Sequence, residues 1–523
     1  MNKRFLLLLL ALAGPAHAQS AHPNVLVSAQ NRPEETAIAI NPKNTNELVA
    51  GANINNQYFS LDAGRTWTAR TLASPHGVWG DPCIVADTTG AFYFFHLSNP
   101  RPNPNPPGSV AFPFIDRLQV QRAASAGAPF ALRSFFALRP PKQQDKLWAT
   151  VDRRTNVIHA TWTEFDAYGS PAPGDSSRIL YSRSADQGLT WSAPQNIGRQ
   201  GDAVDESSTV EGATPAIGPA GEVYVAWAGP RGLVCNRSLD GGLTWPLRER
   251  PVAAQPGGWA FPISGLDRGN GLPITACDLS RGPNRGTLYV NWADQRNGPN
   301  DTDVWLSRSL DGGLSWSPAR RVNNDPPGRQ QFFTWMTVDQ ATGYLWLVWY
   351  DRRNYPDDRT DVYGARSTDG GLTFQNFRYS QTPFTPISSV FFGDYINITA
   401  HNNVVRPLWM RMDGTQTSVW TALTDVTVLA AAAPAAGAGF ALQAYPSPAA
   451  GVLHVALQLP APAAVGFRLR ALTGQTVRTA TPGALRGGAH DLTLSVAGLA
   501  AGVYVLETRV GDELHHQKVA VGE

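Results

Sequence analysis

The sequence predicts an all-β protein, a seven-bladed β-propeller followed by a small β-sandwich, with a six-bladed ring as the alternative. Glycine and proline number 49 and 41 of 523 residues and tryptophan 16, while only 16% of residues are charged. Many turns and aromatic side chains with few charges favour strands over helices. One short phrase recurs along most of the chain, which is typical of a repeat architecture. The length also allows more than one domain.

The first 18 residues predict a signal peptide. A basic start, MNKR, precedes the apolar run FLLLLLALAG, and Ala16-His17-Ala18 has the small-x-small pattern of a cleavage site. The apolar run is too short to span a bilayer. We therefore expect export, with a mature chain that begins at Gln19.

The recurring phrase predicts a tight turn between two strands. It reads RSLDGGLTW at 237–245, and the pattern S-x-D-x-G-x-[TS]-[WF] occurs five times. The aspartate can accept hydrogen bonds from its own turn, the glycine allows a positive φ, and the aromatic residue packs beneath. We therefore expect a structural role for the five aspartates, which are Asp62, Asp186, Asp240, Asp311 and Asp369. The first interval is about twice as long as the others, which predicts a degenerate sixth turn at 122–130 with Ser125 in the aspartate position.

A pair of strands precedes each recurring turn. Seven pairs are predicted, and they begin at Glu35, Asp81, Asp145, Glu211, Ile274, Phe332 and Gly393. A third strand leads into the turn and a fourth leaves it, so each unit makes one blade of four antiparallel strands. The last unit lacks its fourth strand, while the segment NVLVSAQ (24–30) precedes the first unit. We expect this segment to complete the seventh blade and close the ring, within a propeller domain of residues 19–428.

The end of the chain predicts a linker and a second β domain. Residues 429–441 are rich in alanine and glycine and have no amphipathic period, as in a linker. Residues 442–523 hold alternating strands separated by glycine turns, which predicts a small β-sandwich.

Charge and cysteine content narrow the function classes. A net charge of +2 gives no electrostatic footprint for nucleic acid, and we expect a monomer. The three cysteines, Cys83, Cys235 and Cys277, cannot all pair, and no CxxC motif is present, so we interpret them as buried free thiols. We expect no metal and no cofactor. The acidic loop 298–303 offers oxygen ligands for Ca²⁺, but its spacing does not match an EF-hand, and we interpret it as a solvated loop.

The five recurring turns resemble Asp boxes, also called BNR repeats, and the propeller is similar to the sialidase superfamily over about four-fifths of the chain. The resemblance implies a site at the ring centre on the face opposite the Asp boxes. It also implies three arginines that hold a substrate carboxylate, a tyrosine nucleophile assisted by a glutamate, and an aspartate that acts as acid and base.

The tail resembles the sorting domain of the type IX secretion system. The matching residues are Tyr445-Pro446-x-Pro448-Ala449, Leu472-Thr473-Gly474, Gly502-Val503-Tyr504 and Lys518-Val519. The resemblance implies interaction with the type IX machinery and a secreted or surface-attached product. The alternative is a carbohydrate-binding sandwich, against which the scarcity of aromatic residues argues.

Candidate site residues come from the ends of the second strands and the starts of the first strands. The resemblance makes Arg296, Arg353 and Arg411 candidates for substrate binding, with Asp294 and Asp351 beside the first two. An Asp-x-Arg pair at a strand end is equally the pattern of a structural salt bridge between blades. The strand starts add Asp81, Asp145, Lys146, Glu211, Asp394 and Tyr395. Glu211 best matches the assisting glutamate and Tyr395 the nucleophile, with structural roles as the alternative.

Two functional hypotheses follow. The first is a secreted exo-glycosidase of sialidase type that acts on an acidic sugar of extracellular glycans or glycoproteins. The second is a non-catalytic propeller that binds glycan or protein at the same rim. The family's Phe/Tyr-Arg-Ile-Pro signature is absent, and the blade-one loop GANINNQYF has no carboxylate where the family has its acid, which favours the second hypothesis.

Overall fold

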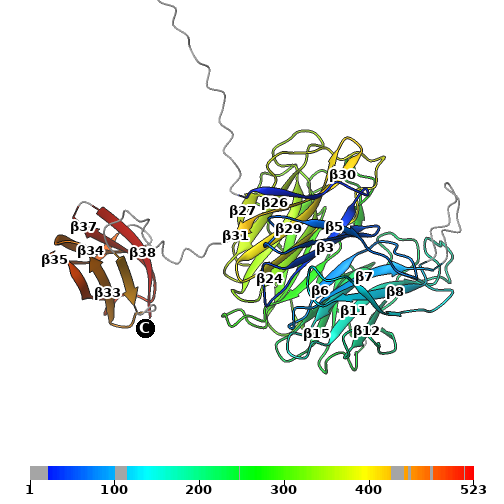
Figure 1. The fold of residues 1–523 in the computed structure, drawn as a ribbon, viewed down its shortest axis with the longest axis horizontal. Coiled ribbons are helices and arrows are strands. Elements are labelled where there is room, and N and C mark those ends of the chain that lie inside the picture. Colours follow the sequence, from blue (N-terminus) through cyan, green and yellow to red (C-terminus); the bar gives the residue numbers. More distant parts are fainter. Residues whose placement is uncertain are drawn as a thin grey trace, which may run out of the picture. The chain divides into compact units, whose positions relative to one another are not determined.

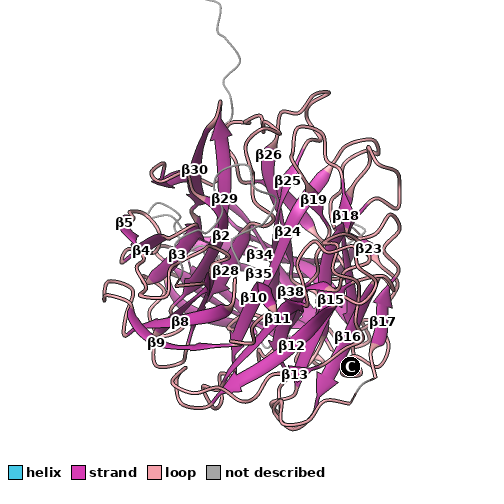
Figure 2. Ribbon diagram, turned by 90° about the vertical axis from the view of Figure 1, so that its right-hand side faces the viewer, coloured by secondary structure: helices cyan, strands magenta, loops and turns pink. Residues whose placement is uncertain are grey.

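The structure is a computed structural model that describes residues 22–100, 115–246, 248–425, 441–445, 449–471, 475–511 and 513–522. The predicted signal peptide, nearly all of the predicted linker, and residues 446–448 and 472–474 of the tail lie outside these ranges. Strands and loops make up the described residues, without a helix (Figure 2). None of these residues therefore belongs to a helix long and apolar enough to cross a bilayer. The chain divides into two compact units, residues 1–426 and 427–523.

The first unit holds seven antiparallel blade sheets, six with four strands that are consecutive along the chain and one with five strands (Figure 1). In blades one to three the strands are β2 (Glu34–Ile40), β3 (Leu48–Asn53), β4 (Asn56–Ser60) and β5 (Thr68–Thr71); β6 (Cys83–Ala86), β7 (Phe92–Ser98), β8 (Arg117–Ala123) and β9 (Ala131–Phe136); and β10 (Gln143–Val151), β11 (Ile158–Phe165), β12 (Ser177–Ser184) and β13 (Gln195–Asn196).

In blades four to six the strands are β14 (Glu211–Ile217), β15 (Val223–Ala228), β16 (Leu233–Ser238) and β17 (Arg250–Ala253); β20 (Ile274–Cys277), β21 (Leu288–Asp294), β22 (Asp303–Ser309) and β23 (Arg320–Arg321); and β24 (Gln331–Asp339), β25 (Tyr344–Asp351), β26 (Asp361–Ser367) and β27 (Gln375–Arg378). A short hairpin, β18 (Ala260–Phe261) and β19 (Gly269–Asn270), is inserted between blades four and five.

The seventh blade joins the two ends of the propeller. It contains β28 (Asn397–His401), β29 (Val404–Asp413) and β30 (Gln416–Ala422), with β31 (Thr424–Asp425) beside β29. Strand β1 (Asn24–Ser28) pairs antiparallel with β30, from Asn24 opposite Ala422 to Ser28 opposite Val419. The prediction of seven blades is therefore confirmed and the six-bladed alternative is wrong. Closure by β1 covers the edge that β30 would otherwise expose to aggregation.

Aromatic side chains fill the core of the blades. The second strands of five blades contain six fully buried tryptophans, which are Trp162, Trp227, Trp292, Trp346, Trp349 and Trp409. Each large indole removes apolar area from water, so the high tryptophan content is explained by packing. All three cysteines are buried free thiols, as expected.

The recurring turns join the third and fourth strands of their blades. In the turn of blade four, Asp240 Oδ1 accepts hydrogen bonds from the Ser238 hydroxyl at 2.6 Å and the Thr244 N–H at 3.0 Å. Gly242 donates its N–H to Ser238 at 2.9 Å and has φ of 82°. The degenerate turn around Ser125 lies at the equivalent place, between β8 and β9.

The second unit contains two sheets around one apolar core. One sheet has the order β32-β33-β36 and the other β35-β34-β37-β38. The strands are β32 (Ala441–Tyr445), β33 (Val452–Leu459), β34 (Ala463–Ala471), β35 (Thr476–Leu485), β36 (Gly488–Ser495), β37 (Gly502–Val510) and β38 (Glu513–Val521). Phe467 and Leu506 of the second sheet share this core with Leu453 and Val455 of the first, which is the packing of a small sandwich.

Candidate functional site

The starts of the first strands bring ionisable side chains together at the ring centre. The residues are Glu35 of β2, Asp81 before β6, Asp145 and Lys146 of β10, Glu211 of β14 and Asp394 before β28. Three of them, Glu35, Asp81 and Lys146, have φ between 46° and 48°. The pairing of β2 with β3 and of β10 with β11 also shifts at this point. Such bulges redirect a side chain from the sheet, here toward the other strand starts.

Lys146 is the cation at the middle of this cluster. Its Nζ lies 2.6 Å from Asp394 Oδ2, and 3.8 Å from both Glu35 Oε1 and Asp81 Oδ2. The lysine is buried, as are these three acids. One ammonium group therefore faces carboxyl groups from three other blades.

Arg268 supplies the second cation from the inserted hairpin. Its Nε and Nη2 donate to the two oxygens of Asp394 at 2.8 and 2.5 Å, and its Nη1 lies 3.6 Å from Asp205 Oδ2. Asn270 of the same hairpin donates to the Asp394 carbonyl at 2.9 Å. Burial raises the pKa of Asp394, but Lys146 and Arg268 outweigh it and bring that pKa to about 2. Asp394 is therefore held as an anion.

The other central acids have the opposite shift. Burial raises the pKa of Asp145 to about 8; Lys146 opposes the rise, and Asp81 and Asp205 add to it. The pKa values of Glu35 and Glu211 are raised well above the ordinary range, again mainly by burial. Neighbouring carboxyl groups with strongly different pKa values are typical of acid–base sites.

A cavity of about 450 Å³ is lined by Asp145, Lys146, Glu211, Arg268 and Asp394. Besides the central acids and the two cations, its wall contains the aromatic residues Tyr168, Trp259 and Phe261. A second cavity of about 430 Å³ shares Asp145, Lys146 and Arg268 with the first and adds Glu35 and Asp81. The volumes are in the range of small-molecule sites, and the mixture of carboxyl groups with aromatic rings suits a sugar.

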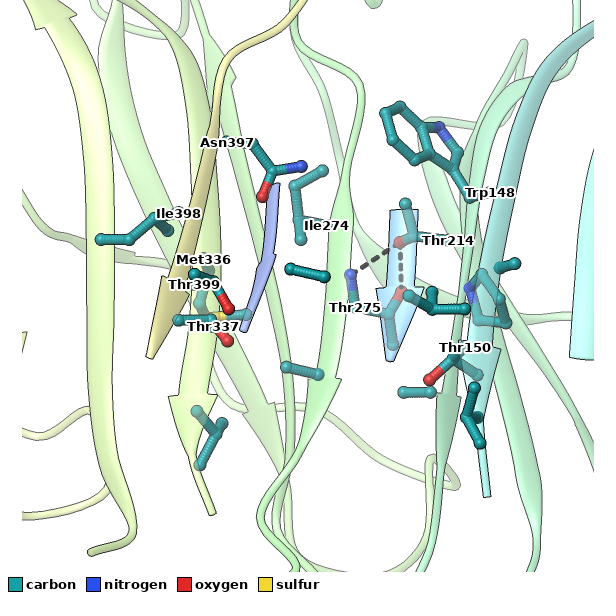
Figure 3. Close-up of a pocket in the computed structure, with 18 of the residues that line it drawn as sticks. Trp148, Thr150, Thr214, Ile274, Thr275, Met336, Thr337, Asn397, Ile398 and Thr399 are labelled. Atoms are coloured by element: carbon teal, nitrogen blue, oxygen red, sulfur yellow. Dashed lines mark hydrogen bonds between the residues drawn. The ribbon is translucent and has the colours of Figure 1, made fainter. Parts of the chain in front are cut away.

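Three aromatic side chains, Trp148, Trp335 and Tyr395, form an aromatic floor next to Lys146 and Asp394, and the five residues line a small third cavity. The Trp148 ring lies 4.8 Å from that of Tyr395 and 4.6 Å from that of Trp335. Below them an axial channel of about 270 Å³ is lined by the first strands of all seven blades (Figure 3). There Thr214 Oγ1 and Thr275 Oγ1 lie 3.1 Å apart and are hydrogen-bonded. The channel wall is mostly uncharged, so the ionisable chemistry is concentrated on the side of Lys146.

The structure places the two predicted catalytic residues at this centre. Glu211 lines the 450 Å³ cavity, and its Oε1 is buried without a hydrogen-bond partner. Tyr395 is buried in the floor, and its hydroxyl likewise has no hydrogen-bond partner within the described ranges. Burial raises the pKa of Tyr395 well above its ordinary value, and the nearby Asp81 and Glu35 add to that rise. The phenol is therefore protonated, and a protonated phenol is a weak nucleophile.

The predicted arginines do not converge on either cavity. Each forms a two-pronged ion pair with an aspartate two residues away, and the pairs are Arg296–Asp294, Arg353–Asp351 and Arg411–Asp413. The Arg296 and Arg353 guanidinium groups also lie over aromatic rings, each 4.2 Å from the ring centre. Each of these three pairs lies within a single blade, and Asp294 and Asp351 are fully buried. Arg353 also reaches the neighbouring blade, where its Nη2 lies 3.6 Å from Asp325 Oδ1.

Sequence reasoning missed several residues of the cavities. Glu35, Asp205, Tyr168 and Arg268 were not among the candidates, although Glu35 stands at a strand start and the repeat alignment was sufficient to find it. Arg268 lies in a hairpin without a counterpart in the other blades, so the repeat gave no signal for it. Within the described ranges, no group of three or more histidine, cysteine or acidic residues has an arrangement that could hold a metal ion.

Comparison with protein-family models identifies the C-terminal unit. Residues 443–522 match the family described as "Secretion system C-terminal sorting domain". The protein is thus an Asp-box β-propeller that carries a type IX sorting domain. This domain directs secretion or attachment to the cell surface through the type IX secretion system.

Solved structures with a similar fold have low sequence identity. A protein of unknown function from Dyadobacter fermentans is 14% identical, with a TM-score of 0.43, and the match covers 66% of this chain and 98% of that one. An ulvan lyase of polysaccharide lyase family 25 is 12% identical, with a TM-score of 0.43 and coverage of 78% and 94%.

A Trypanosoma rangeli sialidase is 12% identical, with a TM-score of 0.37 and coverage of 95% and 85%. The search of curated protein sequences found no match. Sequence identities and TM-scores this low do not establish an activity for this chain.

Proposed function

We propose that this protein cleaves glycosidic bonds of extracellular glycans in the central cavity of the propeller. The observation that carries the proposal is the convergence of Asp145 and Asp394 on one cavity of about 450 Å³ with aromatic walls. Glycoside hydrolysis commonly uses two carboxyl groups, one protonated and one ionised. Secretion by the type IX route brings the cavity to extracellular glycans.

The two carboxyl groups take different roles in this proposal. Asp145, with a pKa of about 8, holds a proton at neutral pH and donates it to the leaving glycosidic oxygen. Asp394, with a pKa of about 2, stays ionised and stabilises the positive charge that develops on the sugar ring. A water molecule then bonds to the anomeric carbon as the glycosidic bond breaks, and its proton leaves to solvent. Lys146 and Arg268 fix the Asp394 carboxylate in place.

The second candidate function is a non-catalytic propeller that binds glycans at the same cavity. One observation favours it: both oxygens of Asp394 already accept hydrogen bonds from Arg268, and Lys146 donates a further one. This arrangement leaves the carboxylate less accessible to substrate.

The test is release of reducing ends by the full-length protein from neutral, amino and sialylated oligosaccharides. We expect Asp145→Asn to lower kcat about 10²- to 10⁴-fold, the usual contribution of a general acid. We also expect wild-type activity to decline as the pH rises through 8, because the acid must be protonated. The matched control is Asp357→Asn, since Asp357 is exposed and its ion-pair partner among the described residues is the exposed Arg359. Glycan binding without cleavage of any of these substrates, or an unaltered kcat in Asp145→Asn, would contradict the enzymatic proposal.

A further inference from the structure

The central cavity has far more acidic than basic groups. Its wall contains six carboxyl side chains, Asp145, Asp205, Glu206, Glu211, Asp267 and Asp394, and two cationic ones, Lys146 and Arg268. Both cations are directed at Asp394, at 2.6 Å from Lys146 and 2.5 Å from Arg268. Both cations are therefore already engaged by an anion, and five further carboxyl groups surround the cavity.

Glu211 is the carboxyl group of this wall that most needs a partner. Its side chain is 1% exposed, and Oε1 has no hydrogen-bond partner. Leaving a buried polar atom unpaired costs about 1–3 kcal/mol, and more for a charged group. Such a group either keeps a proton or accepts a hydrogen bond from a ligand.

The surroundings of Glu211 indicate what kind of ligand satisfies it. Burial raises its pKa well above the ordinary range; Asp205 and Asp145 add to the rise, Lys146 opposes it, and Asp394 adds again. An arriving cation reverses this balance, because it favours the ionised carboxylate. A metal ion is not the best occupant, since the described residues contain no group of three or more histidine, cysteine or acidic side chains that could hold one. The rings of Trp259 and Phe261 suit an organic cation that also has an apolar face.

We propose that the cavity binds a glycan unit that carries a protonated amine, and that Glu211 accepts a hydrogen bond from that ammonium group. The inference rests on the proposed function for the choice of a glycan. It is opposite in charge to the acidic sugar that the sialidase resemblance implies. The arginines required for an acidic sugar are paired with aspartates away from the cavity, whereas the acids required for an amine are inside it.

The test compares binding of amino sugars with that of their neutral counterparts. Isothermal titration calorimetry of the full-length protein at pH 6.5 measures binding of glucosamine and galactosamine tetrasaccharides and of the same tetrasaccharides after N-acetylation. We expect at least one free-amine form to bind ten times more tightly than its N-acetylated form. We also expect binding to release protons, measured in buffers of different ionisation enthalpy, because Glu211 ionises when the ammonium group arrives.

Variants assign the preference to Glu211. Glu211→Gln should reduce the preference to less than twofold and diminish proton release. The matched control, Glu222→Gln, lies on the same blade in the turn between β14 and β15 and should keep both. Glu211→Asp covers the case in which Glu211→Gln does not fold, and it should weaken amine binding with partial retention of the preference.

Three outcomes overturn the inference: equal or tighter binding of the N-acetylated forms, an unchanged preference in Glu211→Gln, or binding of a lysine peptide but of neither amino sugar. Failure of the proposed function looks different. Binding with the amine preference but without cleavage leaves this inference standing, whereas cleavage of neutral glycans without the preference leaves only the proposed function.

Discussion

Aspartates on the two faces of the propeller have opposite chemistry. In the recurring turn of blade four, Asp240 is exposed, and hydrogen bonds from Ser238 and Thr244 lower its pKa to about 2. At the ring centre, burial raises the pKa of Asp145 to about 8. The same side chain is thus an anion that organises a turn in one place and a proton donor in the other.

This contrast separates the repeated turns of the propeller from its central cavity. The turn aspartates recur because each blade needs the same turn, and every oxygen of Asp240 accepts a hydrogen bond from its own turn. The central acids differ from blade to blade, and together they build one asymmetric cavity that no single repeat contains. The residues that recur in every turn therefore belong to the scaffold, whereas the residues that differ between blades form the candidate site.

Among the predicted variants, Lys146→Met should have the largest effect on the free energy of unfolding. The variant leaves Glu35 and Asp81 without their nearest cation, and removing one partner of a buried ion pair costs about 3–5 kcal/mol. Urea denaturation at pH 7, followed by tryptophan fluorescence, measures the loss. All 16 tryptophans precede residue 427, so this signal reports the propeller unit alone.

The control for this prediction is Lys43→Met. Lys43 is exposed in the turn between β2 and β3, and its substitution should alter the free energy of unfolding by less than about 0.5 kcal/mol. A loss as small as that of the control would mean that the central charges do not depend on Lys146.

The contributions of Asp240 and Asp145 to folding stability should also change with pH in opposite directions. Asp240 has a folded pKa of about 2, below the unfolded value, so its contribution is complete above about pH 4 and is lost as the pH falls toward 2. Asp145 has a folded pKa of about 8, so the folded state keeps a proton that the unfolded chain has released. Its contribution therefore declines as the pH rises from about 4 to 8.

Urea denaturation of wild type and Asp145→Asn across pH 4 to 8 measures this sign. The asparagine variant cannot ionise, so the stability of wild type relative to the variant should fall steadily over the interval. If the free energy of unfolding varies with pH in the same way for both proteins, Asp145 has an ordinary pKa. Asp145 would then not hold a proton at neutral pH and could not be the general acid of the proposed reaction.

The sequence could predict the ring and much of its centre because both follow from the repeat. Seven strand pairs and the unpaired segment at 24–30 predicted seven blades with closure by the N-terminal strand, and the strand starts included Lys146, Glu211 and Asp394. The arginines show the limit. An aspartate two residues from an arginine fits both a substrate clamp and a local ion pair, and only the fold shows that Asp351 is buried and already satisfies Arg353.

The smallest predicted loss in the free energy of unfolding comes from a substitution in a single turn. Asp240→Ala removes four hydrogen bonds, from the hydroxyls of Ser238 and Thr244 and the N–H groups of Leu243 and Thr244. The position is exposed and the arrangement resembles a helix N-cap, so we expect a loss of about 1 kcal/mol in the free energy of unfolding. Glycan binding should stay unchanged because the turn is remote from the cavity.

Blade two provides the matched control for that turn. Ser125 stands in the aspartate position, and its side chain makes no hydrogen bond within the described ranges, where only its carbonyl accepts one, from the Ala128 N–H at 3.2 Å. Ser125→Ala should therefore alter the free energy of unfolding by less than about 0.5 kcal/mol. Equal losses in Ser125→Ala and Asp240→Ala would show that the aspartate hydrogen bonds do not stabilise the turn. If Asp240→Ala lowers the free energy of unfolding more than Ser125→Ala does, the recurring aspartate stabilises its turn. Its role is then structural, and the central carboxyl groups remain the candidates for catalysis.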